Sequence, residues 1–257
     1  MKFLIPSYHR SEKQKTLEYL TRLGYIRDEI FIGVQTEADR DSYTASYGDK
    51  ARIVYAPAHN AAGNRNTLLK LLKVGERAVM LDDDISSVDR LVCLTDSKHP
   101  FGRFSPIKTR EAMDELVHNG FRQCKRTGGV TFGTYLVHNE RMMYGAIKGH
   151  GIFSYDRLFP FGFVGLIFTG RLLNEQYDTK EDYEYILHQL RSGRPILRMN
   201  NVALKADAFS KGGCQEAWES DKNFISACML VAKYPEYVKH NPRKHGEVLQ
   251  INRRATE

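Results

Sequence analysis

Three consecutive aspartates, Asp82, Asp83 and Asp84, follow directly on an apolar run that ends at Leu81. Adjacent carboxylates repel one another, and burying them at the end of a strand is unfavourable unless a cation compensates. Hard oxygen ligands favour Mg²⁺ or Mn²⁺, which can join a protein carboxylate to a diphosphate. The aspartates therefore predict a divalent-metal site. The alternative is an acidic turn after a strand, because Asp is a common turn residue.

A second polar segment follows the first apolar run of the chain. It contains Pro6, Ser7, Tyr8 and Arg10. The proline and the hydroxyl can turn the chain, and Tyr8 can offer a flat face to a base. The alternative for Tyr8 is packing on the surface.

A third segment, which contains Gly63 and Arg65, begins a helix shortly before the aspartates. The positive end of a helix and an arginine side chain both attract phosphate. Taken alone, the segment is equally consistent with an ordinary helix start and a solvated arginine.

In this order and spacing, the three segments resemble the start of the family-two GT-A glycosyltransferases. The resemblance implies that residues 6–10 open the nucleotide pocket, although His9 stands where those enzymes often have Asn. It implies that residues 63–66 contact the donor diphosphate and that residues 82–84 form a DxD motif, with Asp82 and Asp84 as metal ligands. The implied small molecules are a UDP-sugar and Mn²⁺ or Mg²⁺. The implied donor-binding residues are Pro6, Ser7, Tyr8, Arg10, Gly63, Arg65, Asp82 and Asp83.

The segment TKEDYEY at residues 179–185 resembles the late Glu-Asp element of the same superfamily. A carboxylate at this helix start could take the proton from an acceptor hydroxyl as it attacks the anomeric carbon. We expect Asp182 to be this base if the reaction inverts configuration, with Glu181 as the other candidate. The alternative is a structural role, because acidic residues in a first turn complement the helix dipole.

The C-terminal segment, residues 233–254, is basic. Beside a catalytic domain such a segment suggests a polyanionic partner such as DNA or RNA, although solubilising charge is an alternative. The candidate DNA contacts are Lys239, Arg243 and Lys244. A late histidine completes the metal site in several GT-A enzymes, and His240 or His245 could do so here; otherwise both only add to a basic surface loop.

A narrower resemblance is to the phage glycosyltransferases associated with TET/JBP-type base hydroxylases. It rests on the aspartates, the helix EDYEYIL, the segment KGGC at residues 211–214 and the basic tail. It implies a 5-hydroxymethylpyrimidine in DNA as acceptor. The alternatives are a glycan or protein acceptor, and a non-enzymatic nucleic-acid-binding module. A nucleotidyltransferase is disfavoured, because residues 6–8 are not a glycine-rich loop with a lysine.

The elements that must position these residues alternate between strands and helices. Strands are predicted at residues 2–5, 29–34, 51–55 and 77–81, with helices at 11–22, 36–47 and 64–74 between them. Ser11 is expected to cap the first helix. This alternation predicts an α/β fold of GT-A type, with a Rossmann-like, mainly parallel sheet flanked by helices.

Beyond residue 95 the pattern is looser. Helices are expected at residues 109–125, 179–191 and 217–233, and Thr179 is expected to cap the second of them. Strands are expected at 129–136, 142–148, 151–155 and 195–203. We predict one domain, residues 1–257, with a nucleotide-sugar-binding half at 1–95 and an acceptor-binding half at 96–257.

Composition limits the class of protein. The 257 residues, 42% of them hydrophobic, are enough for one sizeable core but short for two independent domains. The four cysteines form no CxxC pair, so neither a zinc ribbon nor a disulfide framework is indicated. No signal peptide and no stretch of roughly 18 apolar residues is found, so we expect a cytoplasmic protein, in the host cytoplasm if phage-encoded.

Overall fold

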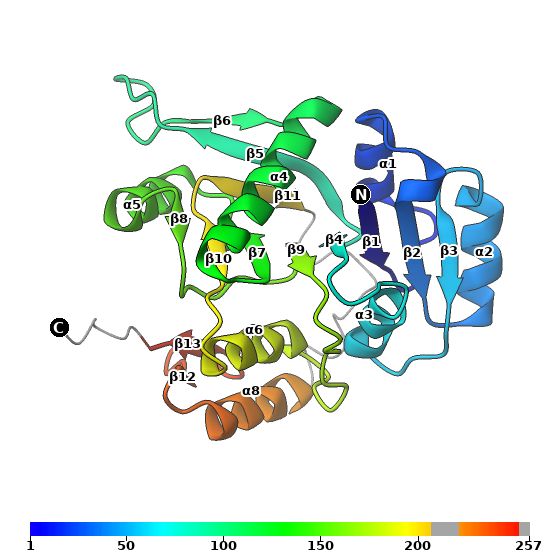
Figure 1. The fold of residues 1–257 in the computed structure, drawn as a ribbon. Coiled ribbons are helices and arrows are strands. Elements are labelled where there is room, and N and C mark those ends of the chain that lie inside the picture. The colour runs from blue at the N-terminus through cyan, green and yellow to red at the C-terminus, as the bar shows by residue number, and fades with distance from the viewer. Residues whose placement is uncertain (207–220, 252–257) are drawn as a thin grey trace.

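The computed structural model describes residues 1–206 and 221–251. The KGGC segment at residues 211–214, together with Arg253 and Arg254 of the basic tail, lies outside these ranges. A mixed eight-stranded sheet, in the order β3-β2-β1-β4-β9-β7-β10-β8, forms the centre of the described structure (Figure 1). Its strands are β1 (Lys2–Pro6), β2 (Ile30–Val34), β3 (Arg52–Tyr55), β4 (Arg77–Leu81), β7 (Thr131–Thr134), β8 (Phe153–Ser154), β9 (Phe163–Ile167) and β10 (Leu197–Met199).

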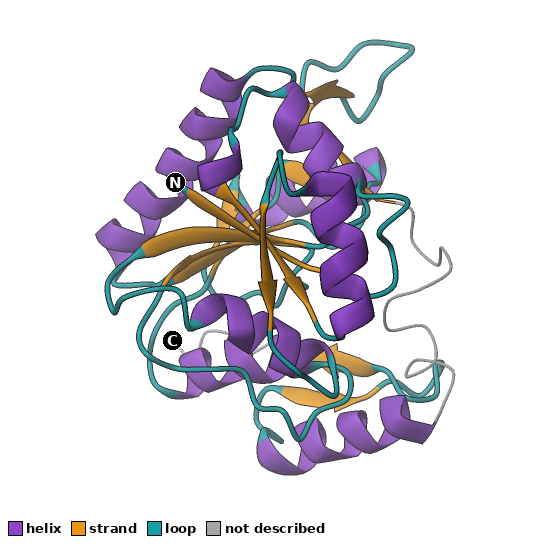
Figure 2. Cartoon of the chain, turned by 90° about the vertical axis from the view of Figure 1, so that its right-hand side faces the viewer, coloured by secondary structure: helices purple, strands orange, loops and turns teal. Residues whose placement is uncertain are grey.

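Helices cover both faces of this sheet, as Figure 2 shows from the side. One face packs against α1 (Lys15–Arg22), α2 (Glu37–Tyr47) and α4 (Arg110–Thr127). The other face packs against α3 (Ala61–Leu69), α6 (Glu181–Arg191) and α8 (Asp221–Lys233). A short 3₁₀ turn, η1 (Arg27–Glu29), precedes β2.

Strand β1 illustrates why this arrangement forms. Successive side chains of a strand point to opposite faces. Phe3 and Ile5 accordingly pack into one core and Leu4 into the other, all three fully buried. A strand that is apolar on both faces is typical of a sheet covered on both sides. The predicted α/β fold with a mainly parallel sheet is confirmed.

Two smaller sheets complete the described structure. β5 (Ile85–Val92) lies between β11 (Val202–Ala206) and β6 (Arg103–Pro106) in one of them. The other is the hairpin of β12 (Val238–His240) and β13 (Val248–Gln250). Because β4 belongs to the central sheet and β5 to a smaller one, the three aspartates occupy the bend where the chain passes between sheets. No described helix is long and apolar enough to cross a membrane.

The central sheet joins strands from both parts of the chain. β9 runs antiparallel between β4 and β7, and β7 pairs in parallel with β10. The carboxyl ends of β1, β4, β7 and β10 consequently lie at one edge of the sheet. In open α/β sheets this edge is where ligands bind.

Two predicted strands are wrong. Residues 142–148 lie in helix α5 (Glu140–His150), which begins after Asn139, whose side chain accepts a hydrogen bond from the Met142 amide. Residues 195–203 do not form one strand, because the chain turns at Asn200 and Asn201 and passes from β10 to β11 in another sheet. In both places an asparagine marks the change of structure.

Two predicted helix caps are also wrong. Helix α1 begins at Lys15, not at Ser11, because residues 7–14 form a loop that packs against the aspartates. Helix α6 begins after Lys180, which adopts a left-handed conformation with φ of 64°. The Thr179 hydroxyl instead donates to Oδ1 of Asn223 on α8.

Candidate active site

A cavity of about 840 Å³ opens at the carboxyl ends of β1 and β4. This is within the range of 300–1,000 Å³ that is usual for ligand pockets. Its walls come from the loop after β1, the start of α3, the bend after β4 and the start of α6. It brings together ten of the predicted residues: Pro6, Ser7, Tyr8, Arg10, Arg65, Asp82, Asp83, Asp84, Glu181 and Asp182.

The three aspartates have different surroundings. Asp83 is buried, whereas the side chains of Asp82 and Asp84 are 41% and 20% exposed. Burial and the charges of Asp82 and Asp83 raise the pKa of Asp84 to about 6. Asp82 and Asp84 are thus the accessible pair, separated by a residue that is turned inward, which is the spacing of a DxD motif.

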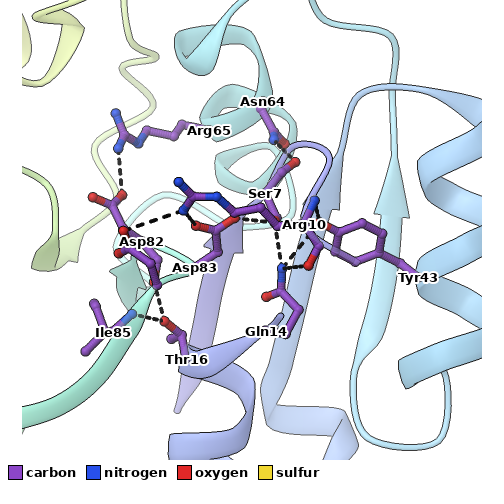
Figure 3. Close-up of polar contacts among 11 residues, drawn as sticks. Ser7, Arg10, Gln14, Thr16, Tyr43, Asn64, Arg65, Asp82, Asp83 and Ile85 are labelled. Atoms are coloured by element: carbon purple, nitrogen blue, oxygen red, sulfur yellow. Dashed lines mark hydrogen bonds and ion pairs between the residues drawn. The ribbon is translucent and has the colours of Figure 1, made fainter. Parts of the chain in front are cut away.

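Asp83 is held by side chains of the loop after β1, which Tyr43 of α2 contacts in turn (Figure 3). Its carboxylate accepts hydrogen bonds from the Ser7 hydroxyl and from Nη1 of Arg10. The Ser7 oxygen also accepts a 2.7 Å bond from Nε2 of Gln14 and lies 2.8 Å from the Tyr43 hydroxyl. These contacts fix the position of the bend after β4, so Asp83 lines the cavity but is already engaged within the protein.

Arg65 links the two sides of the cavity. Its Nη2 donates a 2.8 Å hydrogen bond to Oδ1 of Asp82, and its Nη1 pairs with Oε1 of Glu181 at the start of α6. Its guanidinium lies 5.8 Å from the centre of the Phe161 ring. Arg65 therefore sits beside the aspartates, where its charge faces any ligand that binds them.

The first two residues of α6, Glu181 and Asp182, both line the cavity. Asp182 accepts hydrogen bonds from the amides of Phe161 at 3.2 Å and Tyr183 at 2.7 Å, and Glu181 pairs with Arg65. Burial raises the pKa of Glu181 and of Asp182, and the positive charge of Arg65 opposes the shift in both. A carboxylate with a raised pKa is a better proton acceptor at neutral pH than an ordinary one.

Helix α3 starts one turn earlier than predicted. Asn60 is its N-cap residue, and its side chain accepts a 3.0 Å hydrogen bond from the Gly63 amide. Gly63 is buried in the helix and does not line the cavity; a Cβ there would lie 3.0 Å from that of Ala58. The helix start does face the cavity, through Asn60 and Ala61.

A close contact between β2 and α3 places the helix. Asn64 donates hydrogen bonds to the carbonyls of Ser7 at 2.9 Å and Gly33 at 3.1 Å. A Cβ on Gly33 would lie 2.5 Å from Oδ1 of Asn64, so this approach requires glycine. Asn64 thus connects α3 with the ends of β1 and β2 and sets the position of its neighbour Arg65.

Tyr8 also lines the cavity, and its ring centre lies 3.8 Å from that of His9. His9 has a φ of 54°, and its Nδ1 lies 3.2 Å from Oδ1 of Asp39. The left-handed conformation is uncommon for a residue other than glycine. It occurs at the tight turn that brings Tyr8 into the cavity wall.

The predicted basic residues lie apart from the aspartates. Lys239, Arg243 and Lys244 are exposed on the β12–β13 hairpin. His240 and His245 belong to the same hairpin, and neither lines the cavity. Within residues 1–206 and 221–251, no group of three or more His, Cys, Asp or Glu side chains could hold a metal by itself. Asp82 and Asp84 remain as candidate oxygen ligands, and two carboxylates suit an ion that completes its shell with phosphate and water.

Several cavity residues were not predicted. Gln35 and Thr36 follow β2, so their position after a parallel strand was the available signal. Lys180 and Lys222 also line the cavity; Lys180 stands in the segment TKEDYEY without a predicted role, and no motif indicates Lys222. Burial lowers the pKa of Lys180, and its ammonium donates to Oδ1 of Asn223. The other unpredicted residues of the wall are Ala58, His59, Asn60, Ala61, Pro160, Phe161, Asp178 and Thr179.

Comparison with known proteins gives similarity in structure only. No protein-family model matches the chain, and no curated protein matches it in sequence. A mannosyltransferase from Pyrobaculum calidifontis, solved in complex with GDP-Man and Mn²⁺, superposes with a TM-score of 0.54 at 14% identity. The match covers 94% of this chain and 65% of that one, so the chain spans somewhat less than two thirds of the mannosyltransferase.

Two further solved structures are less similar. Residues 1–349 of S. aureus TarS, in complex with UDP, give a TM-score of 0.43 at 14% identity, over 91% of this chain and 72% of that one. Mouse xyloside xylosyltransferase 1, in its apo form, gives a TM-score of 0.31 at 11% identity, over 74% of this chain and 71% of that one. The likeness to the mannosyltransferase shows that the chain has the GT-A type of α/β fold.

Proposed function

We propose that this protein is a metal-dependent glycosyltransferase that moves a sugar from a UDP-sugar to a hydroxyl group, most specifically that of a 5-hydroxymethylpyrimidine in DNA. The observation that carries the proposal is that two accessible carboxylates, Asp82 and Asp84, line one cavity at the carboxyl ends of β1 and β4 together with the Arg65 guanidinium, which pairs with Asp82. The mannosyltransferase of similar fold, solved with a nucleotide-sugar and Mn²⁺, supports this reading of the cavity.

The donor is assigned to the side of the cavity formed by the first half of the chain. Tyr8 supplies a flat ring for the base, and Asp82 and Asp84 supply oxygens for Mn²⁺ or Mg²⁺. The raised pKa of Asp84 supports this role, because burial and the repulsion from Asp82 and Asp83 disfavour its negative charge, and a bound cation would offset both effects. Bound there, the ion would neutralise charge on the diphosphate as it leaves. Arg65 would add a second positive charge beside it.

In the transfer step, the acceptor oxygen forms a bond to the anomeric carbon while the bond from that carbon to the diphosphate breaks. The diphosphate leaves with the electron pair of the broken bond. Asp182 takes the proton of the acceptor hydroxyl if the reaction inverts the anomeric centre, with Glu181 as the other candidate. If configuration is retained, the role of Asp182 as base fails and the donor site stands.

The proposal of a DNA acceptor rests on charge and position. Lys239, Arg243 and Lys244 are exposed and form no ion pair with any residue in the described ranges. Their hairpin packs against α8, whose Lys222 lines the cavity. Phosphates bound at the hairpin would therefore run beside the cavity opening.

The test is mass spectrometry of DNA after incubation with Mn²⁺ and a panel of nucleotide-sugars. DNA that contains 5-hydroxymethylcytosine should gain the mass of one sugar per modified base, and unmodified DNA should gain none. If neither DNA gains mass while a glycan or protein does, the acceptor assignment is wrong. If no acceptor gains a sugar and the donor is not consumed, the enzymatic assignment itself is wrong.

A further inference from the structure

The C-terminal hairpin carries a stack of rings beside its cations. Phe224, in the first turn of α8, has its ring centre 4.3 Å from that of His245, with 14° between the ring planes. It lies 6.1 Å from the ring centre of His240, with 29° between the planes. Phe224 is 37% exposed, and both histidines are exposed as well. A ring that served only the core would be buried, so this stack is accessible from the solvent.

The charged residues of the hairpin turn beside the stack are all positive. Between residues 239 and 245 the chain has Lys239, Arg243 and Lys244 and no carboxylate. These three side chains are exposed and have no ion-pair partner in the part of the chain that the structure describes. Exposed cations next to exposed flat rings fit a polyanion that also carries aromatic groups.

The stack is fixed in position relative to the cavity. Asn223, which precedes Phe224, accepts hydrogen bonds from Thr179 and Lys180, two residues of the cavity wall. On its other side Asn223 meets Gly246, where a Cβ would lie 2.7 Å from Nδ2 of Asn223 and where φ is 73°. The turn of the hairpin therefore packs directly on the residue that joins α8 to the cavity.

From this arrangement we infer that Phe224, His240 and His245 form a stacking platform for an unpaired base of a nucleic acid, whose phosphates are held by Lys239, Arg243 and Lys244. Aromatic rings beside a basic track are the means by which proteins hold single-stranded nucleic acid without reading its sequence. The inference rests on the proposed function and deepens it, because it names the surface that holds the acceptor strand next to the reacting base.

The experiment compares two strands that differ only in their bases. Fluorescence anisotropy measures binding of a short single-stranded oligonucleotide and of an abasic strand with the same number of phosphates. The wild-type protein should bind the strand with bases more tightly. Phe224→Ala should weaken that binding about 10-fold, the usual effect of losing one base–aromatic stack, and should leave binding of the abasic strand unchanged.

Two variants separate stacking from damage to the fold. Phe224→Tyr keeps a ring and should retain tight binding. Ile225→Ala removes an apolar side chain that is 54% exposed on the same turn, and it should bind both strands as the wild type does. Equal affinity of the wild type for both strands would overturn the inference, because the surface would then bind polyanions without using bases. The inference would also be overturned if Phe224→Ala weakened binding of the abasic strand as much as binding of the strand with bases.

The assay contains neither donor nor metal. Absence of UDP binding would contradict the proposed function and would leave the anisotropy result standing. Loss of the stacking preference would remove the platform and leave the donor site untouched.

Discussion

Arg65 donates a 2.8 Å hydrogen bond to Asp82 and, through its other terminal nitrogen, pairs with Glu181. Asp82 follows β4 and Glu181 begins α6, so one guanidinium joins the two halves of the cavity wall. The side chain of Glu181 is only 5% exposed, whereas that of Asp82 is 41% exposed. The two contacts should therefore differ in energy, because buried pairs lose more than exposed ones when a partner is removed.

We expect Arg65→Met to lower the free energy of unfolding by about 3 kcal/mol, since it leaves the buried Glu181 carboxylate without its cation. The double variant Arg65→Met, Glu181→Gln should recover most of the loss, because the uncompensated charge is gone. Urea unfolding of the two single variants and the double variant measures this coupling. Arg40→Met, which breaks an exposed pair with Asp41, is the control and should change stability far less than Arg65→Met. If the stability losses of the two single variants simply add in the double variant, Arg65 and Glu181 are not coupled and the prediction is wrong.

Asp84→Asn should stabilise the protein in the absence of metal. The pKa of Asp84 is about 6, above the value of about 3.9 for an unfolded aspartate, so ionisation of this carboxyl destabilises the folded state. The wild type should lose stability relative to the variant as pH rises from about 4 through about 6, by roughly 1–3 kcal/mol in total. Melting temperatures of both proteins at several pH values, in EDTA, test this. A variant that is less stable than the wild type at neutral pH would contradict it.

Ionisation of Glu184 should stabilise the folded protein, opposite to the effect of Asp84. This buried carboxylate accepts hydrogen bonds from Arg171, Lys233 and Tyr234, and its pKa is lowered, because these contacts outweigh the opposing effect of burial. Its contribution should be present above the pKa of the unfolded glutamate and be lost as pH falls through the lowered value. Glu184→Gln should cost about 2–4 kcal/mol at neutral pH, measured by urea unfolding, and less near pH 3. Exposed Glu236 gives the matched control, Glu236→Gln. A loss of stability that does not vary with pH would argue against the ionic contribution.

The proton acceptor can be identified by comparing two amide variants. Asp182→Asn removes the negative charge and keeps one oxygen to accept from the Phe161 or Tyr183 amide. If Asp182 is the base, turnover should fall by roughly two to four orders of magnitude with little change in donor affinity. Glu181→Gln should lower turnover less, through its effect on the position of Arg65. The reverse order of the two losses would assign the base to Glu181, and near-normal turnover in both would indicate a retaining mechanism.

The first half of the fold was predictable because its signals are local. β1, β2, β3 and β4 are short apolar runs between helices, and parallel strands must bring their carboxyl ends to one edge. Ser7, Arg10 and the three aspartates each follow such a strand. Their meeting in one cavity therefore follows from the order of elements, without knowledge of any side-chain contact.

The second half depends on packing that leaves little trace in the sequence. β9 is an apolar segment that becomes a strand because β4 and β7 pair with it on both sides. Lys180 and Lys222 reach the cavity because α8 packs against the start of α6 through Asn223. Gly63, by contrast, matched a motif and yet serves the packing of its helix on Ala58. Contacts between distant segments decide these positions, and composition or periodicity does not report them.

The most direct test of the central claim is isothermal titration calorimetry of nucleoside diphosphates, with UDP first, in the presence of Mn²⁺ or of EDTA. We expect UDP to bind with Mn²⁺, EDTA to abolish this binding, and Asp84→Asn to lose the Mn²⁺-dependent part of the binding while remaining folded. Failure of every nucleoside diphosphate to bind, or binding that is equally strong in EDTA, would contradict the assignment of this cavity to a metal-bound nucleotide-sugar.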